Sequence, residues 1–226
     1  MLDSLANNIK LINQKLSGSS ARLVAVTKTQ PISVLKLAYQ LGLKCFGENK
    51  VQEMVEKYEA LPKDIEWHMI GHLQTNKVKY IASFVSLIHS VDSFKLLQEI
   101  NKQGLKNQRV INCLLQVYIA SEETKFGLDE PELLELMDSE ELKSLQNIKI
   151  VGLMGMASNT EKVELIIQEF KRLKSIFDSL NQKLAPENVL LAELSMGMSG
   201  DFEYAIDQGS TLVRIGSALF GNRVYL

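Results

Sequence analysis

Eight short apolar segments alternate along the chain with segments of helical periodicity, and this alternation restricts the fold more than any other feature. The apolar segments are residues 23–28, 44–47, 66–71, 84–91, 109–119, 148–156, 188–194 and 211–216. Helical spacing predicts helices over residues 4–16, 33–41, 50–60, 75–82, 93–103, 130–139, 161–184 and 201–208. Strict alternation of strands and helices predicts an α/β fold with a parallel sheet, and eight such units can close into a (β/α)8 barrel.

The length of 226 residues fits one such barrel as a single domain, residues 1–226. The four prolines are scattered, and no long run of like charges indicates a linker. A doubly wound open sheet would show a similar order of elements. We favour the barrel because the second apolar segment is short and no glycine-rich fingerprint follows the first.

Composition argues against several classes of partner. The formal net charge of −2 is unlike that of most nucleic-acid-binding proteins. The first ten residues do not resemble a secretory signal, and no apolar stretch approaches the ~18 residues that span a bilayer. Cys45 and Cys113 lie in apolar segments and are interpreted as buried small residues in a reducing compartment. We therefore expect a cytoplasmic protein that binds neither nucleic acid nor membrane.

Lys28 ends the first apolar segment. Alternation along a strand places it on the same face as Val24 and Val26. If that face points into the barrel, the amine lies at the carboxyl-terminal mouth, where barrels bind ligands. Partial desolvation disfavours the ammonium form, and a neutral amine attacks aldehydes. Schiff-base chemistry is the hypothesis; the alternative is a lysine that extends into solvent.

Glycine and hydroxyl residues are densest between residues 194 and 221. We expect the seventh strand to end in a flexible turn that contains Ser195, Gly197, Ser199 and Gly200. A helix that begins near Asp201 leaves backbone N–H groups unpaired, and these favour an anion. The alternative is that these glycines only end helices and turns.

The eighth expected strand repeats this arrangement. Arg214 and Gly216 share a strand face, so a guanidinium and a backbone opening can address the same ligand, and Ser217 begins a short helical segment. Barrels often bind phosphate beside the loops that follow their last two strands. A lysine for an aldehyde and a cradle for a phosphate at one mouth together suggest pyridoxal 5′-phosphate (PLP).

Five segments have the wording and spacing of one protein family: AVTKT at 25–29, FGENKVQE at 46–53, WHMIGHLQTNK at 67–77, KFG at 125–127, and residues 195–221. They resemble the pyridoxal phosphate homeostasis family, also known as YggS or PROSC proteins, and the match runs from residue 23 to 223. The resemblance implies a single barrel of the alanine-racemase N-terminal type, without the extra β domain of the racemases. Residues 152–159 depart from the family because many relatives have a proline there.

The resemblance also implies roles for individual residues. Lys28 would hold PLP as an aldimine, Ser199 and the backbone amides of Gly216 and Ser217 would bind the phosphate, and Arg214 would lie near the pyridine ring or phosphate. Asn49 and His72 are expected to line the mouth, without an assigned contact. The implied function is binding of PLP as a carrier or buffer in vitamin B6 and amino-acid homeostasis, without enzymatic turnover.

Other functions remain open at this point. A PLP-dependent amino-acid racemase would use the same lysine, but it needs a second acid–base group, which the related racemases take from their extra β domain. We expect this chain to end at Leu226 without one. A phosphosugar enzyme that forms a Schiff base on Lys28, or an interaction protein with a vestigial pocket, are further alternatives. We expect a monomer, with PLP-dependent apo-enzymes as candidate recipients.

No metal site is expected from the sequence. His68 and His72 are four residues apart, a spacing that suits a metal on a helix, but they lie near the end of an expected strand. We interpret His89 as a hydrogen-bonded histidine of the core or rim. Glu48 could act as a general base, but we interpret it as a solvated or hydrogen-bonded carboxylate at the rim.

Overall fold

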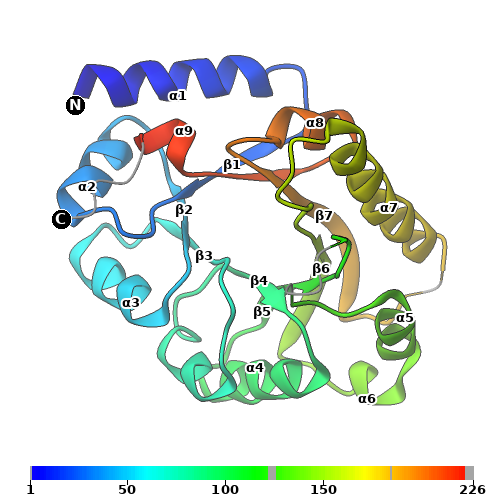
Figure 1. Cartoon of the computed structure of the whole chain (residues 1–226). Coiled ribbons are helices and arrows are strands. Elements are labelled where there is room, and N and C mark those ends of the chain that lie inside the picture. Colours follow the sequence, from blue (N-terminus) through cyan, green and yellow to red (C-terminus); the bar gives the residue numbers. More distant parts are fainter. Residues whose placement is uncertain (1, 122–125, 184, 222–226) are drawn as a thin grey trace.

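Eight parallel strands close into one barrel in sequence order, with β1 paired to both β2 and β8 (Figure 1). The computed structural model describes residues 2–121, 126–183 and 185–221. The strands are β1 (Arg22–Val26), β2 (Cys45–Glu48), β3 (Glu66–Met69), β4 (Leu87–Val91), β5 (Ile111–Gln116), β6 (Ile148–Met154), β7 (Val189–Met198) and β8 (Leu212–Ile215). The predicted barrel is confirmed, and the open-sheet alternative is wrong.

Helices surround the barrel (Figure 1). They are α1 (Leu2–Leu16), α2 (Ile32–Gln40), α3 (Val51–Ala60), the 3-10 helix η1 (Thr75–Tyr80), α4 (Phe94–Lys106), α5 (Glu130–Asp138), α6 (Glu140–Lys143), α7 (Val163–Asn181), α8 (Phe202–Asp207) and α9 (Ser217–Phe220). None of the helices in the described ranges has the length and apolar character needed to cross a bilayer.

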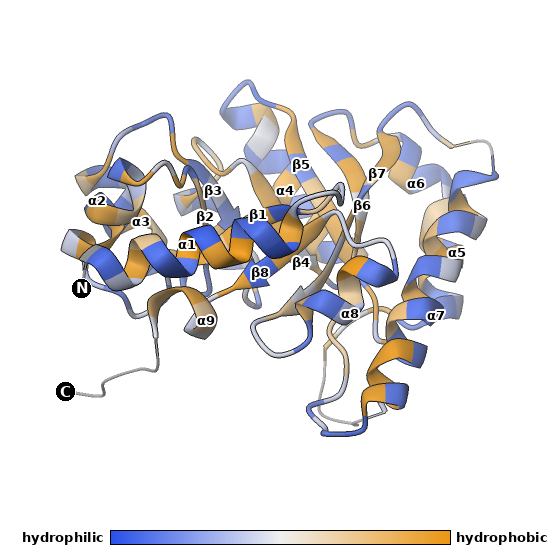
Figure 2. Cartoon of the chain, turned by 90° about the horizontal axis from the view of Figure 1, so that it is seen from above, coloured by the Kyte–Doolittle hydropathy of each residue, from blue (hydrophilic) through white to orange (hydrophobic). Residues whose placement is uncertain are grey.

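The helix α1 precedes the first strand and lies across the outside of the barrel. Its surface alternates between hydrophilic and hydrophobic residues (Figure 2). The buried stripe repeats every three or four residues, as the amphipathic pattern predicts, and consists of Leu5, Ile9, Ile12 and Leu16. This stripe packs onto the main core, and α1 also contacts α9 at the other end of the described chain.

Two apolar layers separate the inside of the barrel from its outer shell. The inner layer consists of Val24, Leu87, Leu114, Met154 and Leu212. The outer and larger layer lies between the strands and the helices, and it includes Ala25 of β1. Val24 therefore points into the barrel and Ala25 away from it, so the predicted face of β1 that leads to Lys28 is the interior face.

The seventh strand differs from the prediction. It continues to Met198, so Ser195 and Gly197 lie within β7 rather than in a flexible turn. Ser195 is paired with both neighbouring strands, and the register shifts between Ser195 and Met198. Gly197, in this irregular part of β7, has a φ of +93° and lets α8 approach the strand closely. A Cβ at this position would lie 2.6 Å from the Cβ of Ala205.

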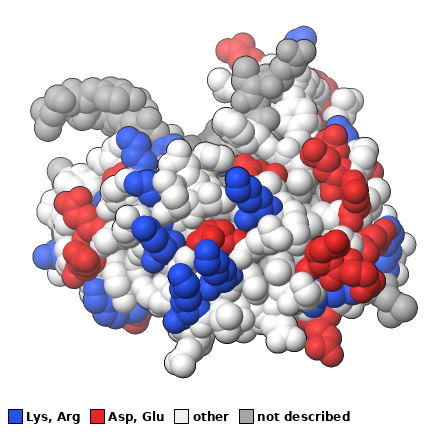
Figure 3. Space-filling view, turned by 90° about the horizontal axis from the view of Figure 1, so that it is seen from below, with Lys and Arg blue, Asp and Glu red and all other residues white. Residues whose placement is uncertain are grey.

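Charged side chains of both signs are distributed over the face shown in Figure 3, between larger areas of uncharged residues. Lysine and arginine gather near its middle, and aspartate and glutamate gather on the side where α5 and α6 lie. The acidic residues of these two helices are Glu130, Glu132, Glu135, Asp138, Glu140 and Glu141. The small formal net charge therefore hides a local separation of charge.

Candidate functional site

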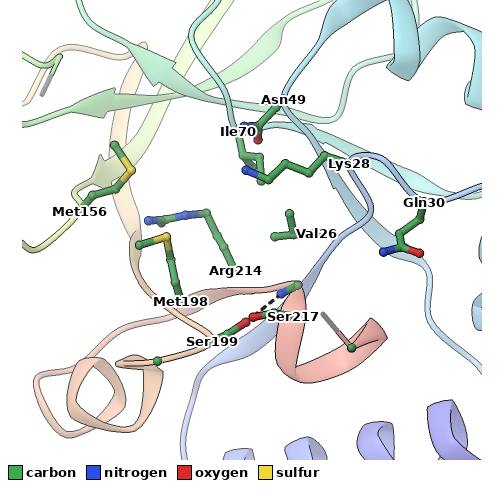
Figure 4. Close-up of a pocket in the computed structure, with 13 residues that line it drawn as sticks. Val26, Lys28, Gln30, Asn49, Ile70, Met156, Met198, Ser199, Arg214 and Ser217 are labelled. Carbon is green, nitrogen blue, oxygen red and sulfur yellow. Dashed lines mark hydrogen bonds between the residues drawn. The ribbon is translucent and has the colours of Figure 1, made fainter. Parts of the chain in front are cut away.

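A cavity of about 300 Å³ opens at the carboxyl-terminal mouth of the barrel. Its lining includes six of the seven residues that the sequence assigned to cofactor binding, namely Lys28, Asn49, Ser199, Arg214, Gly216 and Ser217 (Figure 4). They come from the ends of β1, β2, β7 and β8 and from the loops that follow. The fold therefore brings together residues that are up to 189 positions apart, from residue 28 to residue 217.

Lys28 lies two residues beyond β1, half-buried, with its side chain extended into the cavity (Figure 4). The turn that carries it has an uncommon conformation, because Thr29 has a φ of +64°. The backbone N–H of Thr29 donates to Glu53 Oε1 at 2.6 Å, and that of Gln30 donates to the carbonyl of Thr27 at 3.0 Å. These bonds fix the backbone on both sides of Lys28.

Lys57, a buried lysine of α3, stabilises the same turn. Lys57 Nζ donates to the carbonyl of Thr27, to Glu48 Oε1 and to Glu53 Oε1, each at 2.7 Å. Glu48 also accepts from the Thr27 hydroxyl at 2.5 Å. Burial raises the pKa of Glu48, although the Lys57 ammonium opposes that shift. The prediction that Glu48 is hydrogen-bonded is confirmed. The prediction that it lies at the rim is wrong, because its side chain is buried in the interior.

Lys57 is a residue of the site that was not predicted, although the sequence contains an indication of it. The buried stripe of α3 consists of Val51, Met54 and Lys57, at a spacing of three residues. A lysine on an apolar stripe needs acceptors, because a buried ammonium without partners is costly. Its partners come from the turn after β1, from β2 and from α3 itself, and only the fold brings these together.

The start of α9 forms a set of donors at one side of the cavity. Ser199 Oγ accepts from the backbone N–H groups of Gly216 at 3.1 Å and Ala218 at 3.3 Å (Figure 4). Gly216 lies close to β1, and a Cβ there would be 3.3 Å from Val26 Cβ. A hydroxyl group and two amides that converge on one point can hold an anionic oxygen.

Arg214 lies on the same mouth, deeper in the barrel. It is buried and donates from Nη1 to Ser195 Oγ at 2.6 Å and from Nη2 to the carbonyl of Gly155 at 3.1 Å. Burial lowers the pKa of Arg214 to about 10, so the guanidinium stays charged at neutral pH. The site therefore contains a fixed positive charge whose orientation is set by partners behind it.

Behind Arg214, a column of hydrogen bonds continues through the inside of the barrel. Ser195 Oγ lies 3.0 Å from His89 Nδ1, and His89 Nε2 lies 3.0 Å from His68 Nδ1. Desolvation lowers the pKa of both imidazoles, that of His68 to about 3, so both rings are neutral at pH 7. The interpretation of His89 as a hydrogen-bonded core histidine is confirmed.

His72 is the predicted site residue that the cavity lining does not include. Its exposed ring stacks on Phe126 with 5.1 Å between centroids, and Nδ1 lies 3.2 Å from Asp92 Oδ2. Asn49, in contrast, follows β2 directly and lies above Lys28 in the cavity (Figure 4). Within the described lining, the titratable groups are those of Lys28 and Arg214.

The comparisons with known proteins agree with this geometry. The model of the family "Alanine racemase, N-terminal domain" matches residues 1–224. A pyridoxal phosphate homeostasis protein of Aquifex aeolicus is 47% identical over 206 residues, which cover 91% of this chain and 88% of that protein. A protein of the same name from Schizosaccharomyces pombe is 37% identical and covers 94% of this chain and 88% of its own length.

Solved structures show the same barrel. PipY of Synechococcus elongatus, solved without PLP, has a TM-score of 0.89 at 32% identity, over 96% of this chain and 100% of that chain. PipY with PLP bound has a TM-score of 0.85 at the same identity and coverage. An alanine racemase of Bartonella henselae shares the fold at 17% identity, with a TM-score of 0.73 over 98% of this chain and 59% of the longer racemase chain.

The expected family and fold are thus confirmed at the level of the whole chain. The curated relatives are named for homeostasis rather than for a reaction, in agreement with the expectation of a non-enzymatic role. With a family model that spans nearly every residue and relatives well above 30% identity, this chain belongs to the pyridoxal phosphate homeostasis protein family, whose members are built on the alanine-racemase N-terminal barrel.

Proposed function

We propose that this protein binds PLP at the carboxyl-terminal mouth of its barrel, as an aldimine with Lys28, and that it acts as a carrier or buffer in intracellular vitamin B6 and amino-acid homeostasis. The observation that carries the proposal is that the Lys28 side chain and the donors around Ser199 line one cavity. An aldehyde and a phosphate on one small molecule match these two features. The names of the relatives and the PLP-bound PipY structure support the same ligand.

The residues present fit the group. Ser199 and the amides of Gly216 and Ser217 would hold the phosphate, and Arg214 would add a positive charge near it or near the ring. Val26, Ile70 and Met198 supply apolar walls for a flat ring. The volume of about 300 Å³ lies at the lower end of the range for small-molecule sites.

The role of the remaining predicted contacts follows from their positions. Asn49 lines the cavity above Lys28, and we propose that it contacts the bound cofactor. His72 would have to leave Asp92 and Phe126 to contact the cofactor. A role for His72 in binding therefore rests only on the resemblance to the family. The bound aldehyde supplies an electron-withdrawing group, and the chain supplies the amine, the anion donors and the fixed charge.

Binding without turnover is favoured over racemisation by the scarcity of acid–base groups. A racemase needs a second proton donor or acceptor on the face of the substrate opposite the lysine. Apart from Lys28, the described lining contains one titratable side chain, that of Arg214, which retains its proton at neutral pH and is bonded to Ser195 and Gly155. A guanidinium in this state is a poor proton shuttle.

Borohydride reduction followed by peptide mass mapping tests the proposal directly. PLP-loaded protein should yield one reduced adduct, located on Lys28. Lys28→Ala should lose the adduct and the absorbance of the aldimine, whereas Lys36→Ala should retain both, because Lys36 is an exposed residue of α2. An adduct on another lysine, or none, would contradict the proposed linkage.

Two further assays separate a carrier from an enzyme and from an isolated pocket. Racemisation of common amino acids should be slow, and rapid turnover that depends on Lys28 would favour the racemase alternative. We propose PLP-dependent apo-enzymes as recipients, with the chain acting as a monomer. Transfer to an apo-enzyme should be faster in mixed solution than across a dialysis membrane, and equal rates would indicate simple diffusion.

A further inference from the structure

The amino-terminal mouth of the barrel, opposite the Lys28 cavity, contains a second cavity of about 450 Å³. It is lined by side chains at the beginnings of the strands, including Arg22, Glu66, His68 and Glu193. Cys45, at the start of β2, lies beside it with its sulfur 3.6 Å from His68 Nε2. We propose that Cys45, Glu66 and His68 form a binding site for a zinc-class divalent cation.

The candidate ligand atoms are separated by distances that suit a zinc ion. The sulfur of Cys45, a nitrogen of His68 and a carboxylate oxygen of Glu66 all lie within 4.8 Å of one another. Zinc bonds of about 2.3 Å to sulfur and about 2.0–2.1 Å to nitrogen, at a tetrahedral angle, put these two atoms about 3.6 Å apart. The observed separation from Nε2 is 3.6 Å. The sulfur is also 3.7 Å from Nδ1, so a bound metal would draw it toward the Nε2 side.

The pairing of β2 with β3 places these three side chains at the same mouth of the barrel. Cys45 is paired with Glu66 across β2 and β3, and Glu66 shares a strand face with His68 two residues later. His68 is buried and Cys45 is partly buried, whereas Glu66 is exposed at the mouth. The ion therefore has a route from solvent past an exposed carboxylate to two less exposed ligands. Three protein ligands leave a fourth position for water.

A hydrogen-bond partner holds the other ring nitrogen of His68. A metal-bound histidine usually makes a hydrogen bond from its other ring nitrogen, which fixes the orientation of the ring. His68 Nδ1 has such a partner, since it lies 3.0 Å from His89 Nε2. This contact leaves Nε2 directed away from His89.

Metal binding requires a defined movement of hydrogens. Cys45 is a free cysteine, and the thiolate is the form that binds a metal. Formation of the metal–sulfur bond therefore releases one proton to solvent. His68 coordinates through Nε2 and carries its ring hydrogen on Nδ1, where it donates to His89 Nε2. His89 then donates from Nδ1 to Ser195 Oγ, which has lone pairs for both His89 and Arg214.

The charged neighbours set which ions can enter. Arg22 and Lys149 line the cavity and oppose a cation, but Arg22 is paired with Glu193 at 2.5 Å. The Glu66 carboxylate and the thiolate formed on binding offset the charge of a divalent ion. Thiolate and imidazole ligands favour zinc and similar metals over magnesium and calcium, which prefer oxygen ligands.

Titration of the Lys28→Ala protein with Zn²⁺ tests this inference independently of PLP. We expect one ion per chain by calorimetry, and Co²⁺ should give a thiolate-to-metal charge-transfer band. Cys45→Ser should abolish the band and weaken zinc binding at least tenfold. Cys113→Ser should leave both unchanged, because Cys113 is buried elsewhere in β5.

Glu66→Gln provides a variant that does not disturb the core, because Glu66 is exposed. It should weaken zinc binding while the protein remains folded by circular dichroism. Absence of stoichiometric zinc binding to the parent protein would overturn the inference. Zinc binding that is unaffected by both Cys45→Ser and Glu66→Gln would overturn it as well, since the ion would then lie elsewhere.

Discussion

The two mouths of the barrel are built from different parts of the chain. At the carboxyl-terminal mouth, the polar groups come mostly from loops and from the start of α9, and they include the backbone amides of Gly216 and Ala218. At the amino-terminal mouth they are side chains of the strands themselves, such as Cys45, Glu66 and His68. A loop can direct backbone N–H groups at an anion, whereas a strand uses its amides in the sheet and can offer only side chains.

This difference explains why the two ends suit different ligands. Converging amides and the Arg214 guanidinium are the groups that we propose for binding the phosphate. A thiol, an imidazole and a carboxylate provide lone pairs for a cation. The column of hydrogen bonds from Arg214 through Ser195 and His89 to His68 connects the two mouths through the inside of the barrel. In most barrels of this type, apolar side chains fill that space.

The largest expected effect comes from damage to the carboxyl-terminal mouth alone. Lys57→Met leaves the buried carboxylate of Glu48 without its ammonium partner and should lower the free energy of unfolding by about 3–5 kcal/mol. Urea denaturation measures this. The double variant with Glu48→Gln should recover part of the loss, and zinc binding at the opposite mouth should persist in the folded fraction. A loss below about 1 kcal/mol would contradict the importance of this ion pair.

Acid should affect the column that both mouths share. Unfolded imidazoles take up protons below about pH 6.5, whereas the pKa of folded His68 is about 3 and that of His89 is also lowered. The unfolded state therefore binds more protons between these values. Each histidine should reduce stability by up to about 1.4 kcal/mol per pH unit as pH falls below 6.5.

The raised pKa of Glu48 acts in the opposite direction, because the folded state then holds that proton more tightly. Comparison of urea denaturation across pH for the parent protein and His68→Gln, with a chelator present, isolates the histidine contribution. The variant should show a shallower loss of stability in acid. Identical slopes would mean that His68 is not held neutral.

A smaller effect is expected where α8 contacts β7. Gly197→Ala forces an alanine to a φ of +93° and places its Cβ 2.6 Å from the Cβ of Ala205, at a cost of about 1–3 kcal/mol. Thermal unfolding measures this cost, and PLP affinity should fall as Ser199 shifts. Gly200→Ala, in the adjoining turn, is the matched control, because its Cβ would meet nothing within 4 Å. Equal stability of the two variants would contradict the close approach of α8.

The smallest effect distinguishes recognition from stability. Ser199→Ala removes a hydroxyl from the anion donors and should weaken PLP and inorganic phosphate binding by about fivefold to tenfold, the equivalent of ~1 kcal/mol. Its stability should change little, because Ser199 is only partly buried. Ser217→Ala should bind normally in a fluorescence titration, since Ser217 is expected to act through its backbone amide. Weaker binding by Ser217→Ala than by Ser199→Ala would reverse these roles.

The barrel and most of the carboxyl-terminal mouth could be predicted from the sequence. The period-two pattern of β1 predicted that Lys28 shares a face with Val24, and the density of glycine and hydroxyl residues between residues 194 and 221 indicated a segment that does line the cavity. These features are local, so their spacing along the chain is informative. The short helix α6 was not anticipated, because its four residues are too few for periodicity to be visible.

The amino-terminal mouth could not be predicted in the same way. The pairing of Cys45 with Glu66 depends on the register of two neighbouring strands, and sequence spacing does not show register. The length of β7 was misjudged because Ser195 is typical of turns. In the barrel its hydroxyl is bonded to His89 and Arg214, which removes the cost of burying it in a strand.

The contact between α1 and α9 has a consequence for the chain as a whole. The side-chain amide of Asn8 donates to the carbonyl of Leu219 at 2.9 Å, so the first described helix latches onto the last. The ring of elements is therefore closed twice, by the backbone ladder between β1 and β8 and by this outer clasp. The amides of Gly216 and Ala218 lie between the two closures, so the position of the proposed anion donors depends on a helix from the opposite end of the described chain.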